Sequence, residues 1–105
     1  MVSFEDFKKI DLRAAKIISA ERIFESQRLV KLRVDLGGET RQIVAGIGEF
    51  YEPEGLIGRE IVVVANLEPK TLMGIESQGM LLAANDNKPV LIVPEKNVKP
   101  GSPVI

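Results

Sequence analysis

The chain has 105 residues, of which 45% are hydrophobic, so it fits a single domain over residues 1–105 that can bury its own core. It contains no cysteine and no histidine, which excludes disulfides, thiol catalysis, thiolate metal sites and the commonest general base. Its 14 basic and 15 acidic residues give a net charge of -1, so any attraction for nucleic acid must come from local clusters of cations.

The N-terminus and the apolar runs bear on location. Charged residues follow the first four positions, and no apolar run approaches the roughly 20 residues that a membrane span needs. The sequence therefore predicts no secretory signal, no membrane partner and a cytoplasmic location. We expect no metal or other cofactor, because the chain holds no metal-ligand or phosphate-cradling motif.

The first predicted elements are a short helix and a long strand. Ser3, followed three residues later by Asp6, is typical of a capping box at the start of a helix. The run LRAAKIISAERI over residues 12–23 has no clean period of two or of 3.6. It fits a long, bent strand that changes its buried face partway along, and a helix is the competing interpretation.

An alternating segment gives the clearest signal of secondary structure. Over residues 28–36, apolar and charged side chains alternate as in a half-buried strand. The Gly-Gly pair at 37–38 predicts a tight hairpin turn, and ETRQIVAGI returns as a third strand. Depending on the register, Lys31, Arg33 and Arg41 lie near one another on this hairpin, or they form an ordinary solvated face.

The remaining chain predicts one short helix and further strands. Residues 53–58 begin with proline and end with glycine, which favours a short helix. The apolar runs at 61–67 and 79–84 have the length of buried strands, and PVLIVP at 89–94 reads as another short strand. Residues 68–77 between the two longer runs are predicted to be a polar loop, and such a loop between rigid strands is a natural place to hold a ligand.

Apart from the last short strand at 89–94, the predicted order is three strands, a short helix and two strands. This is the order of an all-β, five-stranded OB-fold barrel with short helical segments at the N-terminus and between strands 3 and 4. Barrels of this kind bind ligands on the face of strands 2 and 3 and on loops 1-2 and 4-5. In this chain those loops are Phe24 to Arg28 and Glu68 to Ser77.

Three segments carry a resemblance to a known family. They are FKKIDLRAAKI, LVKLRVDLGGETRQIVAGI and EGLIGREIVVVANLEPKTLMGIESQGMLLAA, and they fall between residues 7 and 84. They resemble the tRNA-binding OB-fold domain at the C-terminus of many bacterial methionyl-tRNA synthetases, which also exists as small free-standing proteins. The run N-L-x-P-K-x-L-x-G-x-x-S-x-G-M makes the match specific. The resemblance implies a non-catalytic homodimer that binds tRNA largely by shape and backbone, as an auxiliary (beta) subunit of methionyl-tRNA synthetase.

The resemblance also implies which residues contact tRNA: Lys31, Arg41, Asn66, Lys70, Ser77 and Met80. Asn66 and Ser77 have structural alternatives, because each can hydrogen-bond to the backbone of the loop, and Met80 can belong to the core. Lys70, next to a proline in the polar loop, has no evident structural role and fits a phosphate contact. The chain departs from the family at Thr71, where a second basic residue is common.

The sequence also bears on two other functions, a chaperone and an enzyme, and on assembly into a homodimer. FEDFKKIDLR resembles the export-related CsaA chaperones, dimeric relatives of the same fold that bind unfolded peptides, whereas RQIVAGI and ESQGM favour the tRNA binders. An enzyme is disfavoured, because no pair of carboxylates lies in a context that shifts a pKa. The apolar ends Val104 and Ile105 predict a docked C-terminus and support a homodimer, since they would otherwise leave hydrophobic side chains exposed.

Overall fold

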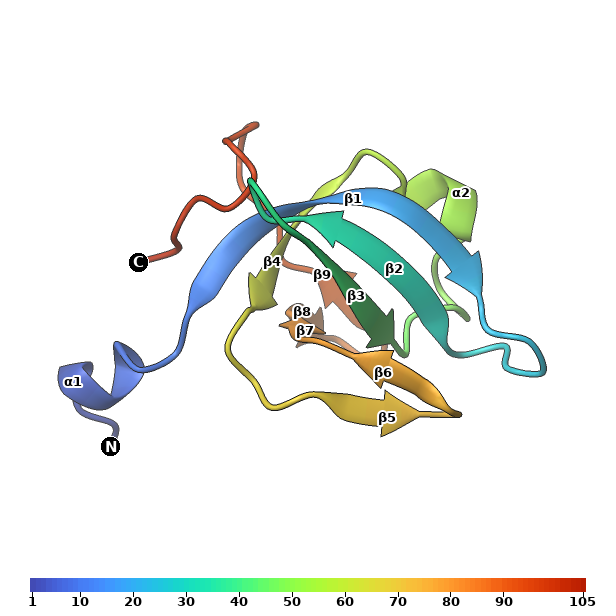
Figure 1. Ribbon diagram of the computed structural model, residues 1–105, viewed down its shortest axis with the longest axis horizontal. Helices are drawn as coiled ribbons and strands as arrows, with labels where there is room; N and C mark the ends of the chain where they lie inside the picture. Colours follow the sequence, from blue (N-terminus) through green and yellow to red (C-terminus); the bar gives the residue numbers. More distant parts are fainter.

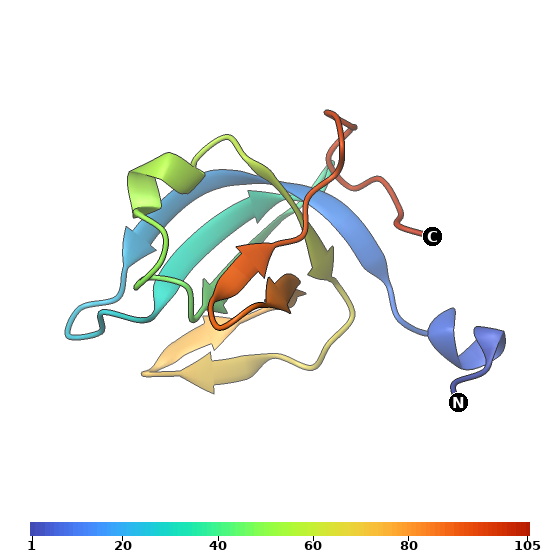
Figure 2. The same ribbon diagram turned by 180° about the vertical axis from the view of Figure 1, so that it is seen from behind.

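The computed structural model describes all residues 1–105, and its main feature is one antiparallel sheet curled into a barrel (Figures 1 and 2). The strands of this sheet, in spatial order, are β3 (Thr40–Ala45), β2 (Val30–Asp35), β1 (Leu12–Arg22), β4 (Glu60–Val64) and β7 (Met80–Leu81). Two small hairpins complete the strands: β5 (Lys70–Leu72) with β6 (Ile75–Ser77), and β8 (Ala83–Asn85) with β9 (Pro89–Leu91). The all-β, five-stranded OB-fold class predicted from the sequence is confirmed.

Both predicted short helices are present. In α1 (Phe4–Phe7), the Ser3 hydroxyl accepts a hydrogen bond from the Asp6 amide at 3.1 Å, as the capping pattern predicts. In α2 (Pro53–Leu56), proline occupies the first turn, where its missing N–H has no partner to lose, and the last residue is fully buried. With four residues each, neither helix has the length that crossing a membrane requires.

β1 is the long, bent strand of the prediction, and the helical alternative is wrong. It pairs with β4 over residues 12–16 and with β2 over residues 16–22. The register shifts between Ile17 and Ser19, so one extra residue sits in β1 at this point. Such a bulge bends a strand and increases its twist, which lets β1 run along both halves of the barrel (Figure 1).

The inward faces of the strands form one core. Ile17, Leu32, Ile43 and Ile61, from four different strands, are each at most 1% exposed. The alternation noted in the sequence over residues 28–36 is the alternation between this core and the outer surface. The barrel is therefore filled with side chains, and any ligand must bind on its outside or at its edges.

The C-terminal tail is docked along β1, as predicted. The Ala14 amide donates to Ser102 O at 2.9 Å, and the Val104 amide donates to Leu12 O at 2.8 Å. The side chain of Ile105 is nevertheless fully exposed, and α1 contains no buried residue. Docking of the backbone thus leaves apolar side chains uncovered at both ends of the chain.

The prediction of a polar loop over residues 68–77 is wrong for most of its length. β5 and β6 form a regular antiparallel hairpin in which Leu72 pairs with Ile75. Met73 and Gly74 connect them with positive φ angles of 49° and 78°, as in the two-residue turns that suit the twist of paired strands. Strands of three residues are too short to establish a period of two, so the sequence pattern does not reveal them.

Packing on the barrel stabilises this hairpin. Leu72 and Ile75 lie against a second hydrophobic cluster, which is separate from the main core and contains the buried residues Ile23, Leu29 and Val44. These residues come from the loop between β1 and β2 and from the outer face of β3. A two-stranded hairpin is at best marginally stable by itself, so this tertiary contact accounts for its order.

The predicted strand over residues 79–84 is divided in two. β7 pairs with β4, whereas β8 pairs with β9 in a different hairpin. Leu81 is buried in the core, but Ala83 and Ala84 are exposed. Small apolar residues such as alanine are tolerated on an exposed hairpin as well as in the core. The apolar run therefore looked like one buried strand in the sequence.

Candidate functional site

The barrel closes between β3 and the segment that leads from β6 to β7, and side chains make most of the bonds. The only backbone bond across this edge runs from the Gln78 amide to Gln42 O, at 2.8 Å. The Gln42 amide donates to the side-chain oxygen of Gln78 at 3.0 Å, and the Gln42 side chain donates to Glu76 O at 2.8 Å. Closure of the barrel thus depends on particular polar residues more than on a regular ladder.

Ser77 is part of this closure. Its hydroxyl accepts a hydrogen bond from the Val44 amide at 2.9 Å and donates to Gly79 O at 3.0 Å. The residue is only 5% exposed, and it is the single buried polar side chain of the protein. The structural alternative stated for Ser77 therefore describes its contacts in this structure.

Arg41 lies on the inner side of the sheet rather than beside Lys31 and Arg33. The register pairs Arg41 with Val34, a core residue, so of the alternatives left open by the sequence, a grouping of all three cations on one face does not occur. Its guanidinium donates to Ala65 O and, at 3.3 Å, to Gln78 O. Arg41 also pairs with the carboxylate of Glu39, so its hydrogen-bonding capacity is largely used within the fold.

Beside the closing edge lies a pocket of about 450 Å³, under the β5–β6 hairpin. It contains three of the residues implied by the resemblance, Lys70, Ser77 and Met80. The other lining residues are Val44, Leu67, Glu68, Leu72 and Gly79. A concave, mostly apolar surface with one cation at its margin is the usual character of a ligand site.

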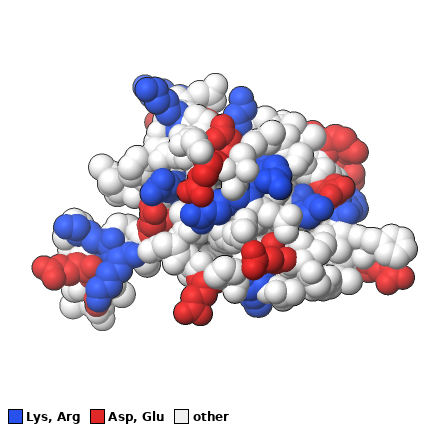
Figure 3. All heavy atoms as spheres, viewed as in Figure 1, with Lys and Arg blue, Asp and Glu red and all other residues white.

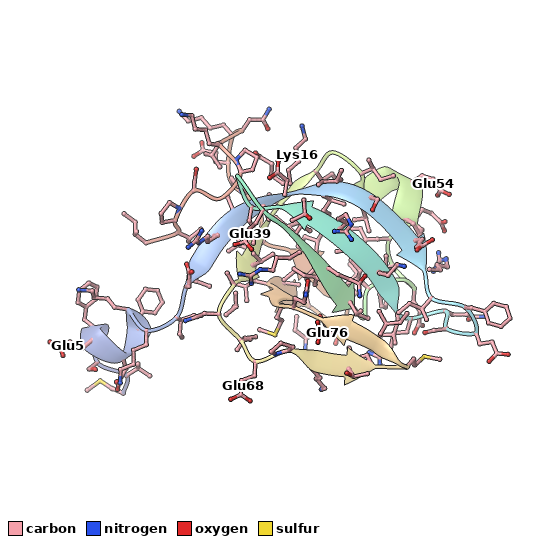
Figure 4. The ribbon with its side chains drawn as sticks, viewed as in Figure 1. Glu5, Lys16, Glu39, Glu54, Glu68 and Glu76 are labelled. Atoms are coloured by element: carbon pink, nitrogen blue, oxygen red, sulfur yellow. The ribbon has the colours of Figure 1, made fainter.

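Lys70 is the available cation of this pocket. It is exposed, and its ammonium makes no ion pair or hydrogen bond, unlike that of Lys31, which lies 2.7 Å from a carboxylate oxygen of Glu21. Glu68 also lines the pocket, but its side chain points away from the barrel (Figure 4). An unpaired ammonium on a short, docked hairpin is well placed to meet an anion from outside.

A basic surface adjoins the pocket on the outer face of β2 and β3. The register places Lys31 opposite Val44 and Arg33 opposite Gln42, so all four side chains share that face. Figure 3 shows Lys and Arg atoms forming a band across this side of the molecule, with acidic atoms between them. Because Val44 lies opposite Lys31 and also lines the pocket, the band and the pocket are neighbours on the barrel.

Asn66 faces away from the pocket, toward the segment that connects α1 to β1. Its side-chain oxygen accepts a hydrogen bond from the Asp11 amide at 2.8 Å, and its nitrogen donates to Lys9 O at 2.7 Å. Both polar atoms of the amide are therefore bound to backbone. This is the structural alternative stated from the sequence, and it fixes the start of β1 to the end of β4.

A charge pair strengthens the same junction. Arg13 donates two hydrogen bonds of 3.0 Å to the two carboxylate oxygens of Asp11. These hydrogen bonds, followed by the negative charge of Asp11, raise the pKa of Arg13 above its ordinary value. Arg13 thus stays charged and bound to its neighbour, and it is not a cation that a ligand can recruit easily.

The sequence reasoning missed several residues of this region. Gln42 and Gln78 join the two sides of the barrel, and Leu67 and Leu72 form walls of the pocket. The sequence held a signal for the glutamines. Gln42 is a polar residue in the edge strand β3, and Gln78 is a polar residue directly before Gly79. No comparable signal existed for the leucines, because their neighbours come from β3, which is distant in sequence.

The amino-acid sequence matches a family described as "Putative tRNA binding domain" over residues 12–103. Its relatives include methionine–tRNA ligases from Archaeoglobus fulgidus and Pyrococcus furiosus, which are 52% and 54% identical over 104 residues. Each alignment covers 98% of this chain but only 16% and 14%, respectively, of the ligase. The chain thus corresponds to a small part of those enzymes.

Solved structures with the same fold include a protein related to methionyl-tRNA synthetase and a chaperone. A MetRS-related protein from Pyrococcus horikoshii superposes with a TM-score of 0.93 at 37% identity, covering 100% of this chain and 98% of that one. The chaperone CsaA from Bacillus anthracis superposes with a TM-score of 0.92 at 33% identity, covering 100% and 99%. The match over residues 12–103, together with the identity to the ligases, shows that this chain belongs to the putative tRNA-binding domain family.

Proposed function

We propose that this protein binds tRNA in the cytoplasm, without catalysing a reaction, and recognises the molecule mainly by its shape and backbone. The observation that supports this function is the membership of the tRNA-binding family combined with an unpaired lysine beside an outer pocket. RNA helices expose phosphates and ribose hydroxyls and hide most base edges, so cations and small polar groups suffice for such recognition.

The six residues implied by the sequence divide into two roles in this proposal. Lys70 and Met80 line the pocket, Lys31 lies on the neighbouring outer face of β2, and all three contact tRNA directly. Arg41, Asn66 and Ser77 have a supporting role, because their polar atoms are bound to backbone groups of the protein. Asn66 fixes the junction of β1 and β4, and Arg41 and Ser77 fix the closing edge of the barrel beside the β5–β6 hairpin.

The salt dependence of binding tests the function. On duplex regions the logarithm of affinity falls with the logarithm of salt concentration by about 0.9 per phosphate neutralised, so three or four contacts give a slope of roughly -3. We expect unfractionated tRNA to bind with this shallow slope in titrations at several salt concentrations. Absence of binding even at low salt would overturn the proposal.

A synthetase is the proposed protein partner. The relatives of this chain are ligases many times its length, and a module that holds tRNA by its backbone does not select one tRNA from another. We propose that the chain is an auxiliary (beta) subunit of methionyl-tRNA synthetase, whose catalytic part makes that selection. The module then adds affinity through a second point of attachment on the same tRNA.

A chaperone is the second candidate, because CsaA has the same fold over the whole chain. Capture of unfolded peptides depends on apolar surface, and the pocket under the hairpin has apolar walls. The identity of about half of all residues to the ligases, against 33% to this chaperone, favours tRNA. Titration of an unfolded client peptide beside tRNA separates the two functions.

We further propose that the protein is a homodimer joined through α1 and the C-terminal tail. Figure 1 shows α1 standing away from the barrel. Phe4 and Phe7 from α1 line an apolar hollow together with Val104 and Ile105, and this hollow has a volume of about 330 Å³. A second copy related by a two-fold axis would cover the same surface on both chains, since such an interface is self-complementary.

Light scattering at micromolar concentration checks the assembly. We expect the mass of two chains for the unmodified protein and of one chain for Phe4→Asp, because a charge on the apolar surface opposes association. Phe50→Asp is the matched control, since Phe50 is an exposed phenylalanine that lies outside the hollow. A single-chain mass for the unmodified protein would contradict the dimer.

A further inference from the structure

Phe24, on the loop between β1 and β2, is an aromatic side chain that the fold does not use. It is 86% exposed, more than any other phenylalanine of the chain. It belongs to neither hydrophobic cluster, and it lines none of the five main pockets. Its two exposed counterparts on α1 differ, because they line the apolar hollow beside the C-terminal tail.

The loop that carries Phe24 is held firmly. Ile23 and Leu29, at its two ends, are 7% and 5% exposed and belong to the second hydrophobic cluster. The Ser26 amide donates to Ile23 O at 2.9 Å, and the Ser26 hydroxyl accepts from the Leu29 amide at 3.0 Å. The aromatic ring is thus displayed by an ordered loop, which lowers the entropy lost when a partner covers it.

The position of Phe24 relates it to the proposed tRNA surface. The cluster that anchors its loop also contains Val44, and Leu72 packs against it; both of these residues line the pocket beside Lys70. Figures 1 and 2 show the β1–β2 loop and the tip of the β5–β6 hairpin at the same end of the barrel. Phe24 therefore stands on a loop, and Lys70 at the start of strand β5, and the loop and the β5–β6 hairpin pack on the same hydrophobic cluster.

The loop that carries Phe24 also holds one unpaired cation. Arg28, on the same loop, makes no ion pair, whereas Arg22 is bound to Gln27 O and to the carboxylate of Glu52. Glu25 is the single carboxylate between residues 23 and 29. The loop thus offers one exposed ring and one available arginine, which are the two groups that contact single-stranded nucleic acid through a base face and a phosphate.

We propose that Phe24 is a stacking platform for an unpaired base of the bound tRNA. This inference rests on the proposed function and adds to it a class of nucleotide, namely one that is exposed in a loop or at an end of the RNA. A base within a duplex is already stacked on both faces, so it cannot offer a free face to Phe24. Every base has such a face, so this contact tolerates any sequence.

Two substitutions of Phe24 test whether binding depends on the aromatic face or only on an apolar side chain of similar size. Phe24→Leu keeps an apolar side chain and removes the aromatic face, and we expect it to weaken binding of tRNA and of a ten-nucleotide oligoadenylate about fivefold. Phe24→Tyr keeps the face and should retain affinity within about twofold. The slope of affinity against salt should be the same in both variants, because no charge changes.

The control for these variants is Phe50→Leu, since Phe50 is another exposed phenylalanine and lies on a different loop. It should leave both affinities unchanged. Full affinity of Phe24→Leu for tRNA and for the oligonucleotide would overturn the stacking while leaving the proposed function intact. Failure of the unmodified protein to bind tRNA would instead overturn the proposed function.

A spectroscopic measurement reports the contact directly. The chain has no tryptophan, so Phe24→Trp introduces a single indole at the tip of this loop. We expect oligoadenylate and tRNA to quench its fluorescence, and a fully paired RNA duplex of equal length to leave it unchanged. Equal quenching by the duplex, or quenching by an unfolded client peptide alone, would overturn the assignment of an unpaired base.

Discussion

Replacing Lys70 with glutamate should weaken tRNA binding by about one to two orders of magnitude at low salt. The ammonium of Lys70 has no partner in the protein, so the substitution removes a charge-assisted contact with phosphate and introduces repulsion. The neutral variant Lys70→Ala should show a smaller loss, and the slope of affinity against salt should become less steep by about one unit. All tRNAs should be affected alike, because phosphates carry no sequence information.

Lys16→Glu provides the control for this experiment. Lys16 is an exposed lysine without an ion pair, and Figure 4 shows it on the side of the barrel opposite to Glu68 and the β5–β6 hairpin. The change of net charge is the same, so a difference between the two variants reports the position of the charge. An equal loss for both variants would mean that tRNA responds only to overall charge, and an unchanged slope for Lys70→Ala would exclude Lys70 as a phosphate contact.

Ser77→Ala should lower the free energy of unfolding by about 1–3 kcal/mol. The substitution removes the hydroxyl that accepts from the buried Val44 amide and donates to Gly79 O. A buried donor without an acceptor destabilises the fold by its full desolvation penalty, which exceeds the net contribution of an average hydrogen bond. Urea unfolding, with the slope compared between variants, measures the loss.

Ser19→Ala is the matched substitution for Ser77→Ala. Ser19 is exposed on β1 and makes no hydrogen bond through its side chain, so its removal should change stability by less than about 0.5 kcal/mol. If Ser77→Ala is as stable as the unmodified protein, Ser77 does not hold the barrel closed. Its hydroxyl would then be available for the role of a tRNA contact that the sequence resemblance implies.

The two variants together distinguish contact from support. Lys70→Glu should leave the unfolding transition in place, because an exposed lysine contributes little to stability. Ser77→Ala should shift that transition while leaving the salt slope of the folded protein unchanged, because no charge is lost. Such a result would show that a residue of the motif N-L-x-P-K-x-L-x-G-x-x-S-x-G-M can stabilise the fold without supplying a charge to the RNA.

The sequence by itself determined the elements whose signals are local. The alternation over residues 28–36, the glycine pair after it and the capping box at Ser3 each act within a few residues, and each predicted element is present. The irregular pattern over residues 12–23 fitted a bent strand, with a helix as the alternative, and the bulge in β1 explains the pattern because it shifts the buried face at a fixed point. The order of these elements was sufficient to identify the barrel.

Only the tertiary structure decided what the candidate site residues do. Arg41 turns inward because the register sets it opposite Val34, and a shift of one residue would have placed it on the outer face. Asn66 and Ser77 bind backbone atoms that are more than 30 residues away in sequence. The β5–β6 hairpin is ordered by a cluster assembled from three separate segments. Such contacts form between residues that are distant in sequence and come together only when the barrel closes. Local periodicity and propensity cannot predict them.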